Sequence, residues 1–292
     1  QGVLSTLTLS ISEAARTVQV DMMETISRLL LNNPRNQHEF RRADGYSRFL
    51  QLLDRVTDYS AQENKLFVQD VFDTIFTIAL DGNPQRVVGN ADAMRLLVDL
   101  VCTGSSVVRI HAARTLHDLL TVNYMNAAVL QTIDGDTTLT DLLLRQEAFP
   151  DGSTSDDDRA ELVDLVAKLL EYMIFLLSSH SMGSLGYVVR SLDQVQASAV
   201  SLGAVVEEAM LTLVSNILCD LRARRAPFNV SELLPTVIGM LRRSFSVPPR
   251  NIAGGERRPG LTRDRRLLLL LEIMGMIVHD SPSLIMIVVE RQ

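Results

Sequence analysis

Three stretches of the chain repeat one pattern of apolar and polar positions. The copies begin at Phe40, Val88 and Leu130, so successive copies are 48 and then 42 residues apart. In each copy an aspartate stands four positions after the first residue of the copy. Apolar residues return nine, twelve and thirteen positions after that first residue. Apolar residues three and four apart lie on one face of an α-helix. The second half of each copy therefore predicts an amphipathic helix.

A small residue follows the aspartate in every copy, as Gly45, Ala93 and Gly135. A small residue at this place is typical of a tight turn between a short helix and a longer one. A further helical pattern, ending at Asn or Gly, precedes each copy, in residues 22–33, 71–83 and 113–123. The predicted unit is a long helix, a short helix, a turn at the small residue and a second long helix.

A unit of this size cannot bury its apolar face alone, and stacking of neighbouring units would bury a continuous core. The period of 42–48 residues is that of armadillo and HEAT repeats. The sequence predicts an all-α fold, an armadillo/HEAT-like right-handed α-solenoid, running as one array through residues 1–292. Polar insertions are expected at about residues 147–158 and 245–264.

Residues 97–144 resemble an armadillo repeat in the spacing of their apolar positions and in the Asn, Gly and Leu-Leu positions that follow. Residues 36–130 are similar to the armadillo-like region upstream of the BEACH domain in BEACH-family proteins of the neurobeachin and Alfy types. The features that carry this likeness are F-R-x-x-x-G-Y from Phe40, L-D-G-N at residues 80–83 and N-x-D-A at residues 90–93.

This resemblance implies a non-catalytic protein-interaction scaffold of membrane trafficking and autophagy. It also implies a cytoplasmic protein with peripheral contact to endomembranes, of which the chain is one segment. An armadillo peptide-binding adaptor of another lineage, such as a formin-type regulatory or cell-polarity module, is the alternative. Sequence beyond Gln292 would separate the two.

The sequence offers no pattern for catalysis, a cofactor or a metal. The five histidines form no H-E-x-x-H motif and no zinc-binding spacing with the two cysteines, and G-x-S-x-G is absent. We therefore expect no enzyme. Two cysteines do not make a disulfide framework, which favours a reducing compartment. The net charge of −7 argues against a general nucleic-acid binder.

In an armadillo array the third helix of each unit lines a concave groove, and polar side chains there can hold an extended peptide. Aligning the helices on Ile26, Ile75 and Leu116 predicts which polar residues face outward. An ordinary solvent-facing surface would carry a similar mixture. The candidate groove residues are Glu24, Arg28, Asp73, Thr77, Arg114, Asp118, Thr212 and Asn216.

Arginines accumulate near the second insertion. Residues 222–266 contain eleven Arg against three acidic residues, a local charge of +8. Six of the arginines are expected to be exposed and mobile rather than paired in a core, where they could contact anionic lipid. The alternative is that they only keep a long loop soluble. The six are Arg250, Arg257, Arg258, Arg263, Arg265 and Arg266.

Overall fold

The computed structural model describes residues 2–56, 58, 61–80, 91–144, 156–176, 181–197, 204–223, 233–246 and 263–279. These residues form α-helices and one short 3₁₀ helix, and no strand occurs among them. The prediction of an all-α fold is confirmed. The chain divides into two compact units, Gln1–Gly135 and Asp136–Gln292.

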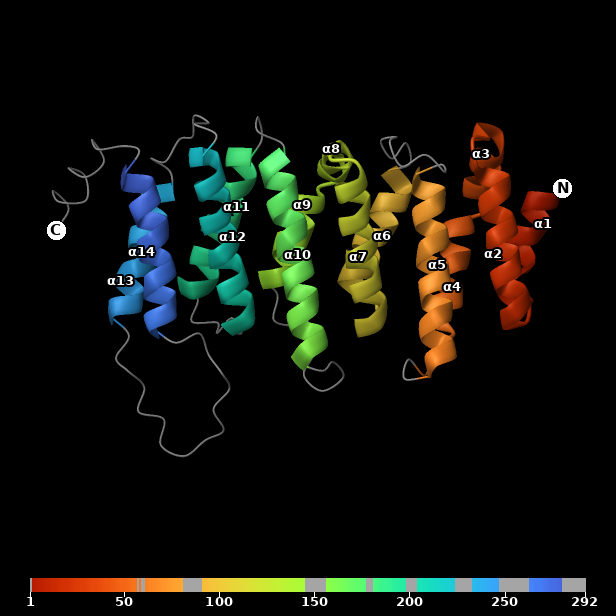
Figure 1. Ribbon diagram of the computed structural model, residues 1–292, viewed down its shortest axis with the longest axis horizontal. Helices are drawn as coiled ribbons and strands as arrows, with labels where there is room; N and C mark the ends of the chain where they lie inside the picture. The colour runs from red at the N-terminus through yellow and green to blue at the C-terminus, as the bar shows by residue number, and fades with distance from the viewer. Residues whose placement is uncertain are drawn as a thin grey trace. The chain divides into compact units, whose positions relative to one another are not determined.

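The first unit arranges its helices in two layers (Figure 1). Helices α2, α5 and α7 lie side by side, because α5 packs against both α2 and α7. Helices α1, α4 and α6 lie behind them, and two short helices connect the layers. The bounds are α1 Val3–Ser10, η1 Ile11–Glu13, α2 Arg16–Leu30, α3 Pro34–Arg42, α4 Gly45–Asp54, α5 Gln62–Leu80, α6 Ala91–Thr103, α7 Ser106–Val122 and α8 Asn126–Thr132.

The core of the first unit is aliphatic with a few aromatic rings. Phe40 is 1% exposed, and its ring lies 5.2 Å from Tyr46 in an edge-on arrangement and 5.6 Å from Phe49. Phe72 of α5 stacks on His111 of α7 with the ring centroids 5.7 Å apart. Each such ring pair adds about 0.5–1.5 kcal/mol beyond the burial of its area.

The second unit repeats the side-by-side arrangement. Helices α10, α12 and α14 lie next to one another, and α11 and α13 pack against each other and against this row (Figure 1). The Tyr187 hydroxyl of α11 donates a 2.6 Å hydrogen bond to the Asp141 carboxylate of α9. The bounds are α9 Gly135–Leu144, whose first residue belongs to the first unit, α10 Asp156–Leu176, α11 Ser181–Ala197, α12 Ala204–Ala223, α13 Leu233–Ser246 and α14 Arg263–His279.

Side-chain hydrogen bonds at helix ends recur 90 residues apart within the first unit. Asn36 Nδ2 donates to the Leu29 carbonyl at 2.7 Å, and Asn126 Nδ2 donates to the Leu119 carbonyl at the same distance. Each bond ties the start of a short helix to the last turn of the long helix before it. Each bond adds a side-chain donor to a carbonyl of the last helical turn, and the Leu119 carbonyl also accepts from the Asn123 backbone N–H at 3.3 Å.

A second pair of bonds has the same spacing. Gln19 Nε2 donates to the Ile11 carbonyl at 3.1 Å, and Arg109 Nε donates to the Val101 carbonyl at 2.8 Å. Both donors are buried. The segment from α1 to α3 and the segment from α6 to α8 therefore share two equivalent side-chain hydrogen bonds. The sequence pattern did not reveal these polar ties.

The turns before α4 and α9 differ in detail from the prediction. The residue with left-handed backbone is the aspartate, with φ of 55° at Asp44 and 56° at Asp134, and not the glycine that follows. Aspartate tolerates this conformation because its short side chain bonds locally. Asp44 accepts a 2.7 Å bond from Ser47 Oγ. In the middle copy Asp92 lies within α6, so the predicted turn at that place is wrong.

The two glycines are needed for space. A Cβ atom at Gly45 would overlap the Phe40 ring, and one at Gly135 would lie 2.9 Å from the Leu130 carbonyl oxygen. Each glycine begins a helix that follows a short helix along the chain, and α4 packs on the short helix α3. A side chain at either position is therefore restricted by its neighbours and not by a left-handed backbone at the glycine itself.

Helices extend into both predicted insertions from their ends. Helix α10 begins at Asp156, so the acidic residues 156–158 are helical, where their charge favours a helix N-terminus. Helix α13 continues to Ser246, and α14 begins at Arg263. The remainder of both predicted insertions, residues 147–155 and 247–262, lies outside the described residues.

Replacing these glycines should destabilise the first unit. We expect Gly45→Ala and Gly135→Val each to lower the free energy of unfolding by about 1–3 kcal/mol, because the new side chain must displace packed atoms. Thermal unfolding followed by circular dichroism at 222 nm measures the change as a lower melting temperature.

The matched control is Gly275→Ala in α14. A Cβ atom there meets nothing within 4 Å. Alanine also favours a helix by about 1 kcal/mol over glycine, so the melting temperature should stay the same or rise. Equal losses in all three variants would contradict the steric explanation.

Candidate functional site

The six candidate groove residues of the first unit lie on α2, α5 and α7, the three helices that form one layer. Glu24 and Arg28 of α2 are both exposed and form an ion pair of 2.5 Å with each other. On α5, the Asp73 carboxylate accepts a 2.7 Å bond from Gln69, and the Thr77 hydroxyl donates to the Asp73 carbonyl at 2.8 Å. These partners belong to the same helix, so this polar surface is largely satisfied locally.

Helices α5 and α7 of the same layer carry further charged side chains. Partial burial raises the pKa of Asp70 above its ordinary value, and the neighbouring Asp73 carboxylate raises it further. On α7, Arg114 and Asp118 are exposed, and His117 Nδ1 lies 3.7 Å from the Asp118 carboxylate. Exposed ion pairs within one helix contribute at most about 1 kcal/mol and are screened by salt. These side chains can exchange their local partners for a ligand at little cost.

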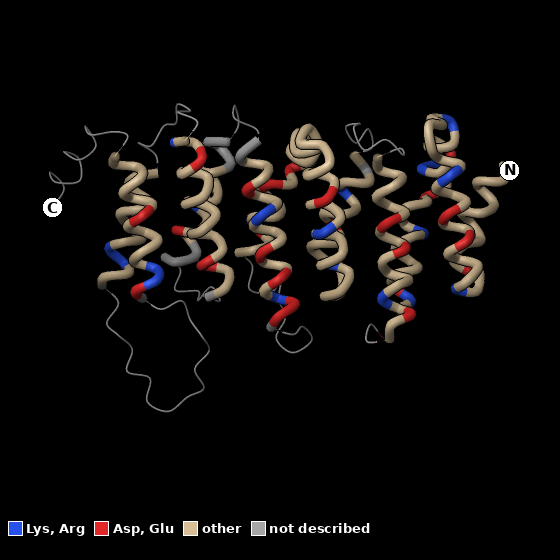
Figure 2. The backbone as a smooth tube through the Cα atoms, viewed as in Figure 1, with Lys and Arg blue, Asp and Glu red and all other residues tan. Residues whose placement is uncertain are grey.

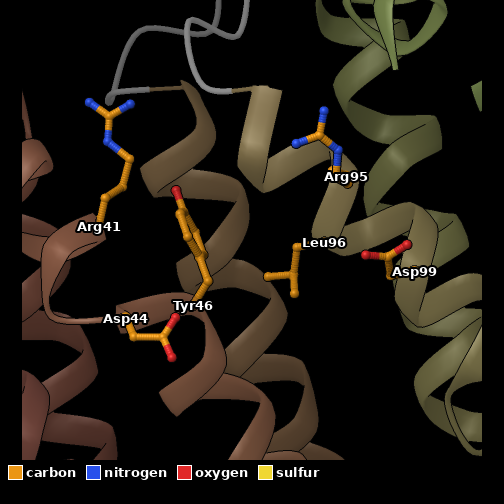
Figure 3. Close-up of a pocket in the computed structure, with 7 residues that line it drawn as sticks. Arg41, Asp44, Tyr46, Arg95, Leu96 and Asp99 are labelled. Carbon is orange, nitrogen blue, oxygen red and sulfur yellow. The ribbon is translucent and has the colours of Figure 1, made fainter. Parts of the chain in front are cut away.

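A cavity of about 250 Å³ opens in the first unit between the α3–α4 turn and α6 (Figure 3). Arg41 and Arg95 stand on its opposite walls, and Leu96 points into it. Its carboxylates are Asp44 and Asp99. Two guanidinium groups and two carboxylates balance in formal charge, so the cavity has no net charge that would select a charged ligand.

A larger cavity, of about 360 Å³, lies between α10 and α12 in the second unit. We refer to it as the α10–α12 groove. Thr212 and Asn216, two of the residues predicted from the sequence, both line it. Its other lining residues are Ala160, Val163, Asp164, Ala167, Lys168, Glu171, Val205, Glu208, Ala209 and Leu213.

The rim of the α10–α12 groove is acidic. It carries three carboxylates and one ammonium group, a formal charge of −2. Lys168 pairs with Asp164 of its own helix at 2.6 Å, and Glu208 pairs with Arg265 at 3.0 Å. Asn216 Nδ2 of α12 donates to the Glu171 carboxylate of α10 at 3.2 Å. Figure 2 shows acidic positions distributed along α10 and α12.

The arginines near the second insertion divide into separate groups. Arg265 pairs with Glu208 at 3.0 Å, and Arg266 pairs at 2.5 Å with Glu207, whose side chain is only 4% exposed. The expectation that these arginines are not paired in a core is wrong for Arg266, because α14 packs against α12 and brings Arg266 onto the buried Glu207. Arg265 is exposed and also has an acidic partner on α12. Arg263 begins α14, and Arg250, Arg257 and Arg258 lie outside the described residues.

A metal site and a membrane-spanning helix are both absent from the described residues. Within the described residues, no group of three or more His, Cys, Asp or Glu is placed to hold a metal ion. Among the same residues, none of the helices has both the length and the apolar character needed to cross a bilayer. The two cysteines are free, with Cys102 half-buried and Cys219 exposed.

No protein-family model matches the chain, and no curated protein compared with it is a significant match.

The sequence pattern indicated part of the α10–α12 groove but not its acidic wall. Thr212 and Asn216 were found by extending the spacing of the earlier copies to α12. Glu171 and Lys168 were missed because α10 was not aligned with those copies. Lys168 and Glu171 stand four and seven residues after Asp164, a spacing that places all three on one face of the helix. This spacing could have identified them from the sequence.

The Glu207–Arg266 pair should stabilise the second unit. We expect Arg266→Ala to lower the free energy of unfolding by about 1–3 kcal/mol, because Glu207 loses a cationic partner in a buried position. Urea unfolding of the chain, followed by circular dichroism, measures this loss.

Arg265→Ala is the matched control. Both members of that pair are almost half exposed, at 48% and 44%, so the loss should be below about 1 kcal/mol. A larger loss for Arg265→Ala than for Arg266→Ala would show that burial does not decide the strength of these pairs.

Proposed function

We propose that the chain is a non-catalytic protein-interaction scaffold, built as an armadillo/HEAT-like right-handed α-solenoid, that binds an extended peptide. The α10–α12 groove carries this proposal. It combines an apolar lining with polar groups from two helices, and its volume of about 360 Å³ lies within the usual range of binding sites. The side-by-side order of the long helices within each unit and the 42–48-residue sequence period support the repeat architecture.

We further propose that the scaffold belongs to a BEACH-type protein of membrane trafficking or autophagy, located in the cytoplasm. Its support is the sequence pattern of residues 36–130. The structure of the α10–α12 groove does not depend on this lineage, because an armadillo adaptor of another lineage could use the same surface. A BEACH domain with WD repeats encoded after Gln292 would favour the first lineage, and other domains there would favour the second.

Selection from a phage-displayed library of random dodecapeptides tests the binding function. We expect the immobilised 292-residue chain to enrich a related set of peptides that do not bind after the chain has been heat-unfolded. Synthetic copies should bind with micromolar dissociation constants in fluorescence anisotropy. A library that yields no shared pattern and no measurable binding would argue against a peptide-binding scaffold.

A peripheral contact with anionic membrane is proposed for Arg250, Arg257 and Arg258. Each basic residue near such a surface contributes about 1 kcal/mol. We expect the chain to co-sediment with phosphatidylserine-containing vesicles at low salt, to bind less at physiological salt, and to lose binding when the three arginines become alanine.

Arg265 and Arg266 are left unchanged in this test because their loss would disturb the packing of α14 on α12. Vesicles of phosphatidylcholine alone are the lipid control. If the unaltered chain stays in the supernatant with anionic vesicles at low salt, the membrane contact does not exist.

A further inference from the structure

We propose that the α10–α12 groove takes an extended peptide segment in which a lysine or arginine stands next to an aliphatic residue. This inference rests on the proposed peptide-binding function and specifies the chemical class of the peptide. The groove's shape, its apolar lining and its acidic rim each support it.

Small side chains open the groove. Ala160 and Ala167 of α10 and Ala209 of α12 line it, and larger side chains at these positions would narrow the channel between the two helices. The lining runs from Ala160 to Glu171 on α10 and from Val205 to Asn216 on α12. Eleven helical steps of 1.5 Å give a channel about 16 Å long.

The dimensions favour an extended segment over a helix. About five residues of an extended chain span 16 Å at roughly 3.3 Å per residue. Helices α10 and α12 pack directly on each other, so a helix about 10 Å across cannot lie between them. The groove of about 360 Å³ accommodates a few side chains of a segment that lies along its opening.

The lining accepts an aliphatic side chain. Val163 and Leu213, at 0% and 1% exposed, close the floor of the groove, and the half-buried Ala167 and Ala209 keep apolar surface that a ligand can cover. Val205 is an apolar residue that remains 45% exposed at one end. Covering such surface gains about 25 cal/mol per Å² of apolar area removed from water.

The acidic rim favours a peptide in which a basic residue stands next to the aliphatic residue. Asp164 and Glu208 already have cationic partners in Lys168 and Arg265. Glu171 accepts its hydrogen bond from the neutral amide of Asn216, and an ionised carboxylate has about four acceptor sites. A lysine or arginine of the peptide can therefore bind Glu171 without breaking an ion pair. An acidic residue there would face a rim of formal charge −2.

The test compares binding of the dodecapeptide library to the 292-residue chain and to three variants. Glu171→Lys reverses the charge at the proposed contact, and Ala209→Leu fills the channel. Glu272→Gln is the matched control, because it removes an exposed carboxylate of the same unit outside the groove. Melting temperatures within about 2 °C of the unaltered chain establish that each variant is folded.

We expect the enriched peptides to carry a basic residue next to Val, Leu or Ile. Their affinity should fall at least about tenfold with Glu171→Lys and with Ala209→Leu, and stay within about twofold with Glu272→Gln. Replacing the basic residue of a selected peptide by norleucine should cost about fivefold on the unaltered chain. On Glu171→Lys the same replacement should not weaken binding and should strengthen it slightly, because it removes a like charge from the contact.

The possible failures are distinct. If no peptide is enriched on the unaltered chain, the proposed function fails and this inference with it. If peptides bind but ignore both groove variants, the chain binds peptides elsewhere and the inference alone is overturned. Selection of acidic peptides, or a gain of helical circular dichroism in the bound peptide, would likewise overturn it.

Discussion

Apolar packing between neighbouring long helices is the constraint on which the structure depends. Helix α5 shows it most clearly, because it is packed on one side by α2 and on the other by α7. Val68, Val71 and Ile75 are completely buried in this position. No long helix of the first unit could bury so much of its surface alone, and the short helices and turns serve to return the chain to the next packing position. The polar faces that remain are what the chain can use for binding.

Helix ends are the second requirement of such packing. A helix that is packed on both sides still has carbonyls at its last turn without partners in the helix. Asn36 and Asn126 add a side-chain donor at such helix ends in the same way, 90 residues apart, by donating to Leu29 and to Leu119, which also accepts from the Asn123 backbone. Gln19 and Arg109 show that the side chain can change when the bond is kept, since both donate to the carbonyl eight residues earlier. The repeat therefore preserves hydrogen bonds as well as apolar positions.

The sequence predicted the features that follow from periodicity and missed those that depend on atomic contact. Leu52, Leu100 and Leu142 are buried as their spacing required, because a helical period determines which face packs. The turn was predicted only in part. A small residue after aspartate was a correct signal for Gly45 and Gly135, but a pattern cannot distinguish a left-handed backbone from a lack of room beside Phe40. The acidic wall of the α10–α12 groove was missed because α10 follows an insertion that ends the regular spacing.

Residues that look alike in the sequence acquire different roles once their neighbours are known. Arg265 and Arg266 stand in the same basic stretch as Arg257 and Arg258, yet their partners are Glu208 and Glu207 on α12. Glu207 is buried, so its pair with Arg266 holds α14 against α12, whereas Glu208 also borders the α10–α12 groove. Asp164 and Glu208 of the rim pair with Lys168 and Arg265, whereas Glu171 accepts its hydrogen bond from the neutral amide of Asn216. The packing of α14 on α12 thus gives two arginines of the basic stretch acidic partners, and in the proposed peptide complex it leaves the contact with a basic residue to a single carboxylate of α10.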